Sequence, residues 1–140
     1  MSLIEKALAI ALEAHKGQVD KAGKPYILHP LRLMTGLEDE IEMIAALLHD
    51  VIEDSDITAE DLKRAGIPEE VIEIIGYLTK QTGEDYDDFI ERISNHRKAS
   101  RVKIKDIEDN MDISRLETIG EVDLARLAKY HKAVKHLKSL

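Results

Sequence analysis

The sequence predicts an all-α protein, a compact assembly of roughly seven or eight helices, from three observations. Apolar residues recur at three- and four-residue spacing along nearly every segment, which is the period of an amphipathic helix. The alternating apolar and polar pattern of a half-buried strand is absent, so β-rich architectures are excluded. Residues typical of helix starts and helix ends also punctuate the chain between the apolar segments.

The first half of the chain contains three predicted helices. The first covers residues 3–15 and stops before Gly17, because glycine is favoured just beyond a helix end. A turn-rich loop follows. A short helix is then predicted over residues 30–37, with Pro30 in the first turn of that helix. The third covers residues 40–54 after the potential cap Asp39 and is the most apolar in the chain. It is therefore expected to be buried on most sides.

The second half contains five further predicted helices. They cover residues 58–65, 68–80, 85–93, 100–116 and 121–140. The first of them begins with the capping pattern Thr58-x-x-Asp61, and the last ends in lysines that suit the negative end of a helix dipole. Neither an internal repeat nor a linker interrupts the pattern. Residues 1–140 are therefore predicted to form a single domain.

Composition excludes several classes of function. The chain has 140 residues and no cysteine, which excludes a disulfide scaffold, a thiolate metal site, an iron–sulfur cluster and a cysteine nucleophile. Charged residues interrupt the apolar segments, so neither a signal peptide nor a membrane span is predicted. The protein is expected to be cytoplasmic.

Charge is distributed unevenly along the chain. The net charge of -8 divides into +2 for residues 1–37, -15 for residues 38–91 and +5 for residues 92–140. Such an acidic middle segment repels polyanions, so duplex nucleic acid is not an expected partner. A small anionic ligand remains compatible with the charge if the basic ends or a metal contact it.

An ionisable cluster interrupts the most apolar predicted helix. His49 and Asp50 are adjacent there, and Glu53 and Asp54 follow within one helical turn. Ionisable groups in apolar surroundings cost free energy unless they are paired or bind a cation. Imidazole and carboxylate together suit Mn²⁺, Fe²⁺ or Zn²⁺. A solvated helix end with a hydrogen-bonded core histidine explains the same pattern without a metal.

Two further sets of residues are ambiguous when taken alone. His29 precedes a proline at a helix start, where it is a helix cap, a surface residue or a ligand. Asp106 and Asn110 lie four residues apart on one face of an amphipathic helix. They are either site residues or solvated side chains, as Glu108 and Asp109 are expected to be.

Three segments in this order resemble the signatures of HD-domain hydrolases of the RelA/SpoT type, particularly the stand-alone small alarmone hydrolases. The segments are HKGQVDKAGKPYILHP at 15–30, ALLHDVIEDS at 46–55 and VKIKDIEDNMDISRL at 102–116. The resemblance implies a single helical HD-type hydrolase domain that holds one divalent metal, usually Mn²⁺. The metal ligands that it implies are His29, His49, Asp50 and Asp106.

The same resemblance implies hydrolysis of the 3′-pyrophosphate of ppGpp or pppGpp, an alarmone reaction of the stringent response that releases pyrophosphate and GDP or GTP. Glu53 and Asp54 match the family's acidic pair, which positions or activates the attacking water. Lys21 and Asn110 match nucleotide-contacting residues. The implied chemistry is sound, because a metal with two His and two Asp ligands has positions left for water and a phosphoryl oxygen. Glu53, one helical turn away, can accept the proton.

The chain departs from the family pattern at three positions. Asp20 and Ile107 stand where the family usually has Arg, and Ile113 stands where a polar residue that contacts the base is common. Guanine selectivity therefore stays open, with a related purine nucleotide such as ppApp as the rival substrate. Other hypotheses are an HD phosphohydrolase acting on a nucleoside monophosphate or NADPH, and a non-catalytic nucleotide-sensing module. The oligomeric state is not predicted.

Overall fold

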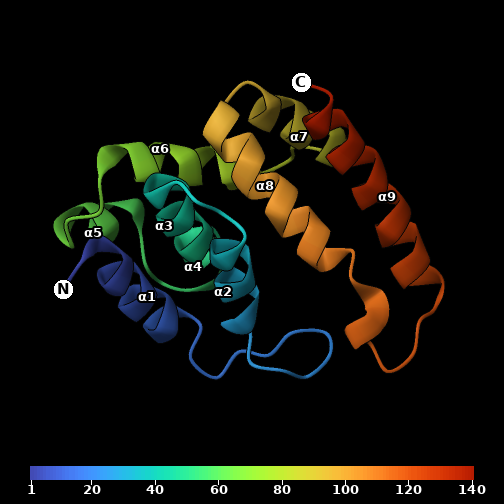
Figure 1. Ribbon diagram of the computed structural model, residues 1–140, viewed down its shortest axis with the longest axis horizontal. Coiled ribbons are helices and arrows are strands. Elements are labelled where there is room, and N and C mark those ends of the chain that lie inside the picture. The colour runs from blue at the N-terminus through green and yellow to red at the C-terminus, as the bar shows by residue number, and fades with distance from the viewer.

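Nine α-helices and one 3-10 helix make up the computed structural model, which describes residues 1–140 (Figure 1). The helices are α1 (Leu3–Ala14), α2 (Leu28–Thr35), α3 (Glu40–Leu48), α4 (Val51–Asp54), α5 (Ala59–Arg64), α6 (Glu69–Leu78), α7 (Tyr86–Ser94), α8 (Arg97–Asn110), η1 (Ile113–Arg115) and α9 (Glu121–Lys138). The all-α prediction is confirmed. None of the helices combines the length and apolar character that a membrane crossing needs.

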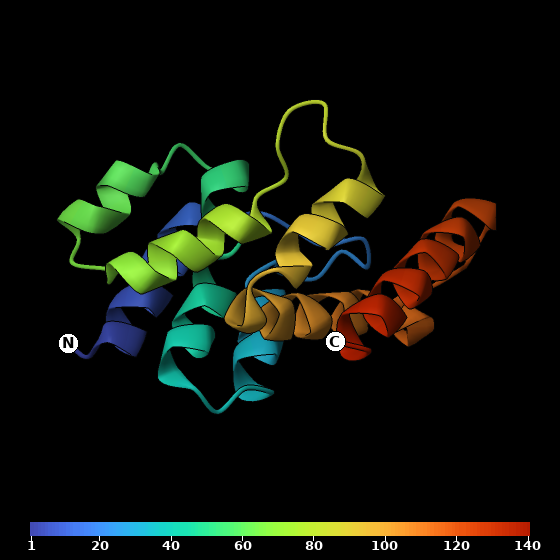
Figure 2. The same ribbon diagram turned by 90° about the horizontal axis from the view of Figure 1, so that it is seen from above.

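Helix α3 lies at the centre of the molecule, where it packs against α1, α2, α6 and α8. Residues 44–48 of this helix are completely buried, as expected from the most apolar stretch of the sequence. Helices α1 and α9 lie at opposite sides of the molecule in both views (Figures 1 and 2). Helix α8 runs between α9 and the α2–α3 pair, with which it also packs. This arrangement brings α2, the end of α3 and α8 together.

The prediction of one continuous helix over residues 40–54 is wrong. The helix is interrupted at His49 and Asp50, which separate α3 from α4. Asp50 has φ -107° and ψ 2°, which departs from α-helical geometry. Next to it, His49 Nδ1 donates to the carbonyl oxygen of Ala46 over 2.7 Å. Side-chain bonds to the local backbone compete with the helical ladder. The break therefore coincides with the two residues that the sequence selects as candidate ligands.

Other element boundaries differ from the prediction by a few residues. The helix predicted over 100–116 begins at Arg97, where the backbone amide of Ala99 donates to the His96 ring, and it ends at Asn110. Its last part forms the 3-10 turn η1, for which Asp112 accepts a hydrogen bond from the Ser114 amide. The short helix predicted over 30–37 covers residues 28–35. The predicted stop at Gly17 is confirmed, since its φ of 79° favours glycine.

A partly buried ion pair closes the loop between α6 and α7. Arg92 donates from Nε and Nη2 to the two carboxylate oxygens of Glu84 over 2.9 and 3.0 Å. The same guanidinium donates to the Thr79 carbonyl oxygen over 2.9 Å. The hydrogen bonds from Arg92, together with one from the Gln81 amide, lower the pKa of Glu84 to about 2.

We expect this pair to stabilise the fold above pH 4.5 and to lose its effect as the pH falls toward 2. The reason is that the pKa of Glu84 is lower in the folded chain than its ordinary value of 4.5, so the unfolded chain binds the proton first. Urea unfolding at several pH values should show a shallower loss of stability for Glu84→Gln than for the wild type between pH 5 and 2. Parallel curves would contradict the role assigned to the pair.

Candidate metal centre and adjoining pocket

Three buried side chains from three helical segments converge in the interior. They are His29 from α2, His49 from the end of α3 and Asp106 from α8, and one ligand atom of each lies within 4.8 Å of the others. His29 Nε2 is 2.8 Å from Asp106 Oδ1, and His49 Nε2 is 3.6 Å from the same oxygen. The structure therefore brings together three of the four predicted metal ligands in a geometry compact enough to surround one ion.

Asp50, the fourth predicted ligand, lies at the edge of this cluster. Its Oδ2 atom is 3.0 Å from His49 Nε2, and its side chain is 24% exposed. The Tyr26 hydroxyl donates to the same carboxylate oxygen. This contact joins residues 24 positions apart, so no local sequence pattern predicts it. All four predicted ligands are thus adjacent, although their role as ligands remains a prediction.

The protonation pattern of His49 suits a metal ligand. Its Nδ1–H donates to the Ala46 carbonyl oxygen, which leaves Nε2 facing the cluster. That Nε2 atom is buried and makes no hydrogen bond. In the neutral form of His49 the nearby Asp50 oxygen cannot satisfy Nε2, because both atoms are acceptors. A divalent cation between imidazole nitrogens and carboxylate oxygens would satisfy these atoms together.

The electrostatic environment of the cluster favours a cation. Burial alone lowers the pKa of His49, but the charge of Asp50 and the contacts with Asp106 outweigh it and raise this pKa well above its usual value. The surrounding carboxylates therefore favour positive charge at this point of the interior. Either protonation of His49 or binding of a divalent metal supplies this positive charge.

Asp106 is the most highly connected side chain of the cluster. Besides the two histidines, it accepts a hydrogen bond from Lys103 Nζ at Oδ2 over 2.8 Å. It also accepts one from Asn110 Nδ2 at Oδ1 over 3.1 Å. The Lys103 side chain is only 13% exposed, and its ammonium lies 5.1 Å from the centre of the Phe89 ring. Asn110, a predicted substrate contact, therefore touches a predicted metal ligand.

Asp109 also belongs to the site, which the sequence does not predict. It was expected to be solvated, yet its side chain is only 11% exposed and its Oδ2 lies 2.6 Å from His29 Nδ1. Arg32 donates to the same carboxylate from Nε and Nη2 over 2.7 and 2.9 Å. Burial alone would raise the pKa of Asp109, but hydrogen bonds from His29 and Arg32 lower it. Its position one helical turn after Asp106 was the available signal.

Glu53 and Asp54, the predicted catalytic pair, lie outside the converging ligand atoms. Both side chains belong to α4 and are exposed. Glu53 Oε1 accepts a hydrogen bond from the Lys80 amide over 3.0 Å. Partial burial raises the pKa of Glu53; the Lys80 hydrogen bond offsets part of this, and the charges of Asp50 and Asp54 add to it. Partial burial and Asp50 also raise the pKa of Asp54.

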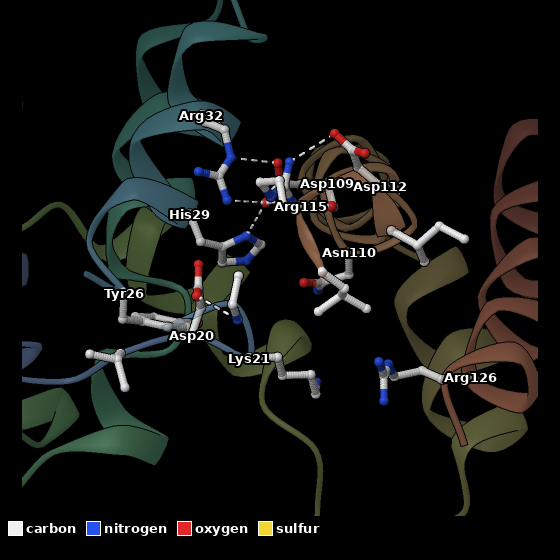
Figure 3. Close-up of a pocket in the computed structure, with 14 residues that line it drawn as sticks. Asp20, Lys21, Tyr26, His29, Arg32, Asp109, Asn110, Asp112, Arg115 and Arg126 are labelled. Carbon is white, nitrogen blue, oxygen red and sulfur yellow. Dashed lines mark hydrogen bonds and ion pairs between the residues drawn. The ribbon is translucent and has the colours of Figure 1, made fainter. Parts of the chain in front are cut away.

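A pocket of about 250 Å³ adjoins the cluster on the side of His29 (Figure 3). Its walls come from the loop before α2, from α2, from the end of α8 and η1, and from α9. The two predicted substrate contacts, Lys21 and Asn110, both line it. Figure 3 shows Lys21 and Arg126 on opposite sides of the opening. Four cationic side chains line the pocket, namely Lys21, Arg32, Arg115 and Arg126, together with the three acids Asp20, Asp109 and Asp112. Arg32 and Arg115 pair with two of these acids, and the positive excess of the lining suits an anionic ligand.

The three departures from the family pattern have different structural roles. Asp20 Oδ1 accepts hydrogen bonds from the amides of Ala22 and Lys24, each over 2.9 Å, and so shapes the loop. Ile107 is 1% exposed and belongs to the apolar core rather than to the pocket. Ile113 does line the pocket. Of the three, Asp20 and Ile113 therefore bear on what the pocket binds.

Comparisons with known proteins agree with this geometry. Residues 7–118 match the model of the family described as HD domain. A guanosine-3′,5′-bis(diphosphate) 3′-pyrophosphohydrolase from Vibrio cholerae is 36% identical over 109 residues, which are 74% of this chain and 15% of the relative. A protein of the same description from Aquifex aeolicus is 33% identical over 120 residues, 77% of this chain and 17% of the relative. The chain thus spans less than a fifth of either relative.

A solved structure has the same fold. It is described as "A metazoan ortholog of SpoT hydrolyzes ppGpp and plays a role in starvation responses". The superposition has a TM-score of 0.84 and covers 99% of this chain and 86% of the other, at 24% sequence identity. At that identity the likeness concerns the helical fold, which includes the arrangement of the helices that carry the cluster.

Proposed function

The chain belongs to the HD-domain family, and we propose that it is a metal-dependent hydrolase that removes the 3′-pyrophosphate of ppGpp or pppGpp. The observation that carries the proposal is the convergence of His29, His49 and Asp106 within 4.8 Å, beside a pocket lined by four cationic side chains. The pyrophosphohydrolases among its relatives support the same reaction. In this proposal residues 1–140 act as one hydrolase domain.

His29, His49, Asp50 and Asp106 would hold the metal, with Mn²⁺ as the first candidate. Two nitrogen and two oxygen donors suit a divalent transition metal, and the buried Nε2 of His49 has no other partner. When bound, such a metal supplies a lowered pKa for a ligated water and neutralises charge on the phosphoryl group. Lys103 holds the outer oxygen of Asp106, so that the inner oxygen stays directed at the histidines.

Residues around the metal site take the remaining roles. Glu53 accepts the proton of the attacking water on its carboxylate, assisted by Asp54, since its raised pKa makes it a better base than an ordinary glutamate. Lys21 and Asn110 bind the nucleotide from two walls of the pocket. The negative charge of the substrate is attracted by the cations of the pocket, which offset the acidic character of the chain's middle segment.

The apolar side chain of Ile113 in the pocket wall favours a second purine as substrate. A hydrophobic contact accepts guanine and adenine alike, because it reads no donor or acceptor on the base. We therefore place ppApp beside ppGpp as a substrate.

A product assay tests the proposal. Purified protein with Mn²⁺ is expected to release pyrophosphate from ppGpp, from ppApp or from both, and no product is expected in the presence of a chelator. Orthophosphate released from a nucleoside monophosphate or NADPH would instead favour the alternative phosphohydrolase. Failure to hydrolyse any of these compounds, by a preparation that binds the metal, would overturn the enzymatic proposal and favour nucleotide sensing.

A further inference from the structure

We propose that Asp109 is a positioning residue that fixes the tautomer and ring orientation of His29, and that Arg32 and Arg115 hold Asp109 in place. The inference deepens the proposed function, on which it rests for the role of His29 as a metal ligand. Under this proposal, residues of the pocket wall also orient a ligand of the proposed metal site.

The contact between Asp109 and His29 keeps a proton on Nδ1 of the ring. Asp109 Oδ2 lies 2.6 Å from His29 Nδ1, and an ionised carboxylate can only accept a hydrogen bond. Nδ1 therefore carries a proton. Nε2 then faces Asp106 Oδ1, 2.8 Å away, and a metal shared by these two groups would take the place of the proton on Nε2. Histidine ligands in metal sites commonly have such an outer carboxylate partner.

Asp109 is itself restrained by two arginines. Arg32 binds both of its carboxylate oxygens. Arg115 Nη2 donates to the Asp109 carbonyl oxygen over 2.7 Å and lies 3.4 Å from Oδ2. Figure 3 shows the three side chains grouped above His29 at the pocket rim. A carboxylate with this many directional contacts has little freedom to rotate away from the imidazole.

The network also sets the register between two helices. His29 and Arg32 lie one turn apart on α2, and Asp106 and Asp109 lie one turn apart on α8. His29 contacts both aspartates, and Arg32 contacts the second of them. The two faces are therefore matched through three charged contacts, so a shift of α8 along α2 would break the alignment of His29 with Asp106.

Asp109→Asn separates positioning from packing, because the two side chains have nearly the same shape. The amide of Asn can offer an N–H to His29 Nδ1, which would leave the ring protonated only at Nε2, where the metal needs a lone pair. Its amide oxygen can still accept one hydrogen bond from Arg32. The exchange of aspartate for asparagine beside a functional histidine is known to favour the wrong tautomer.

The test measures the tautomer and the metal affinity separately. Nitrogen-15 NMR of the metal-free protein is expected to show Nδ1 of His29 protonated in the wild type and unprotonated in Asp109→Asn. Titration with Mn²⁺ alone is expected to show an affinity about 10- to 100-fold lower for the variant. Asp109→Glu keeps an ionised acceptor and should recover the wild-type tautomer and part of the affinity.

Glu108→Gln is the matched control. It makes the same charge change one residue earlier on α8, where the exposed side chain pairs only with Lys105 and Lys138, and its metal affinity should equal that of the wild type. Arg32→Met provides a second variant if Asp109→Asn does not fold, since it loosens Asp109 without touching His29. A several-fold loss of affinity is expected there.

An unchanged tautomer and unchanged metal affinity in Asp109→Asn would overturn the positioning role and leave the proposed function intact. If the wild type itself binds no divalent metal, the proposed function fails, whereas the NMR measurement still decides whether Asp109 sets the His29 tautomer.

Discussion

Glu53→Gln is expected to lower kcat for pyrophosphate release by about 10²- to 10⁴-fold, the range for losing a general base. Glu53 lies three residues after Asp50, a proposed ligand, and its side chain on α4 is exposed. Its raised pKa, due first to partial burial, makes its carboxylate a stronger proton acceptor. Glutamine cannot accept that proton, but its amide oxygen can still accept the hydrogen bond from the Lys80 amide. The fold around the site should therefore be retained.

Two further measurements make the Glu53 result specific. Mn²⁺ affinity should be unchanged in Glu53→Gln, because the predicted ligands are untouched. Asp56→Asn makes the same kind of charge change at an exposed residue just beyond α4 and should retain wild-type kcat. A Glu53→Gln enzyme with kcat near the wild-type value would show that another group, with Asp54 the first candidate, accepts the proton.

Asp106→Asn is expected to abolish metal binding and to destabilise the fold at the same time. The carboxylate is a proposed ligand and also the hydrogen-bond partner of Lys103, 2.8 Å away. Without it, a side chain that is 13% exposed keeps its charge in the interior without a carboxylate partner. Removing one member of a buried ion pair typically costs about 3–5 kcal/mol. Urea unfolding of the metal-free protein measures this loss, and Mn²⁺ titration measures the binding.

The double variant Asp106→Asn with Lys103→Met separates the two effects. Replacing a buried pair by groups without opposed charges is often nearly neutral for stability, so most of the lost unfolding free energy should return. The Mn²⁺ affinity of the double variant should stay more than about 100-fold below that of the wild type. Losing only a residue that hydrogen-bonds to a ligand costs roughly 10- to 100-fold. If the double variant were as unstable as Asp106→Asn, the Lys103 charge would not be the source of the destabilisation. If either variant bound Mn²⁺ like the wild type, Asp106 would not be a ligand.

Most of the helical fold could be predicted because helix formation is a local property. Apolar spacing and caps placed every predicted helix close to an observed one, including the central segment over residues 44–48. The break at His49 and Asp50 could not be predicted in this way. It accompanies a bond from the histidine ring to the Ala46 carbonyl oxygen and a contact from Tyr26, 24 residues distant in the sequence, to Asp50.

The candidate site was only partly predictable for the same reason. His29, His49, Asp50 and Asp106 were named from a resemblance in motif order, and the structure brings them together. The prediction that Asp109 is solvated is wrong; only its position one helical turn after Asp106 distinguishes it from Glu108 in the sequence. Its partner His29 is 80 residues away, and only the packing of α2 against α8 shows that one acid faces the cluster and the other faces solvent.

The sequence by itself determined that the chain is helical, where its helices lie, and which histidines and acids are candidates for metal chemistry, because these features depend on residues within a few helical turns and on the order of motifs. The tertiary structure alone decided which acid hydrogen-bonds to which histidine, where the central helix is interrupted at the site, and which cations line the pocket. The contacts of His29 with Asp106 and Asp109 join residues 77 and 80 positions apart. Such contacts depend on how the helices pack, which no local periodicity specifies.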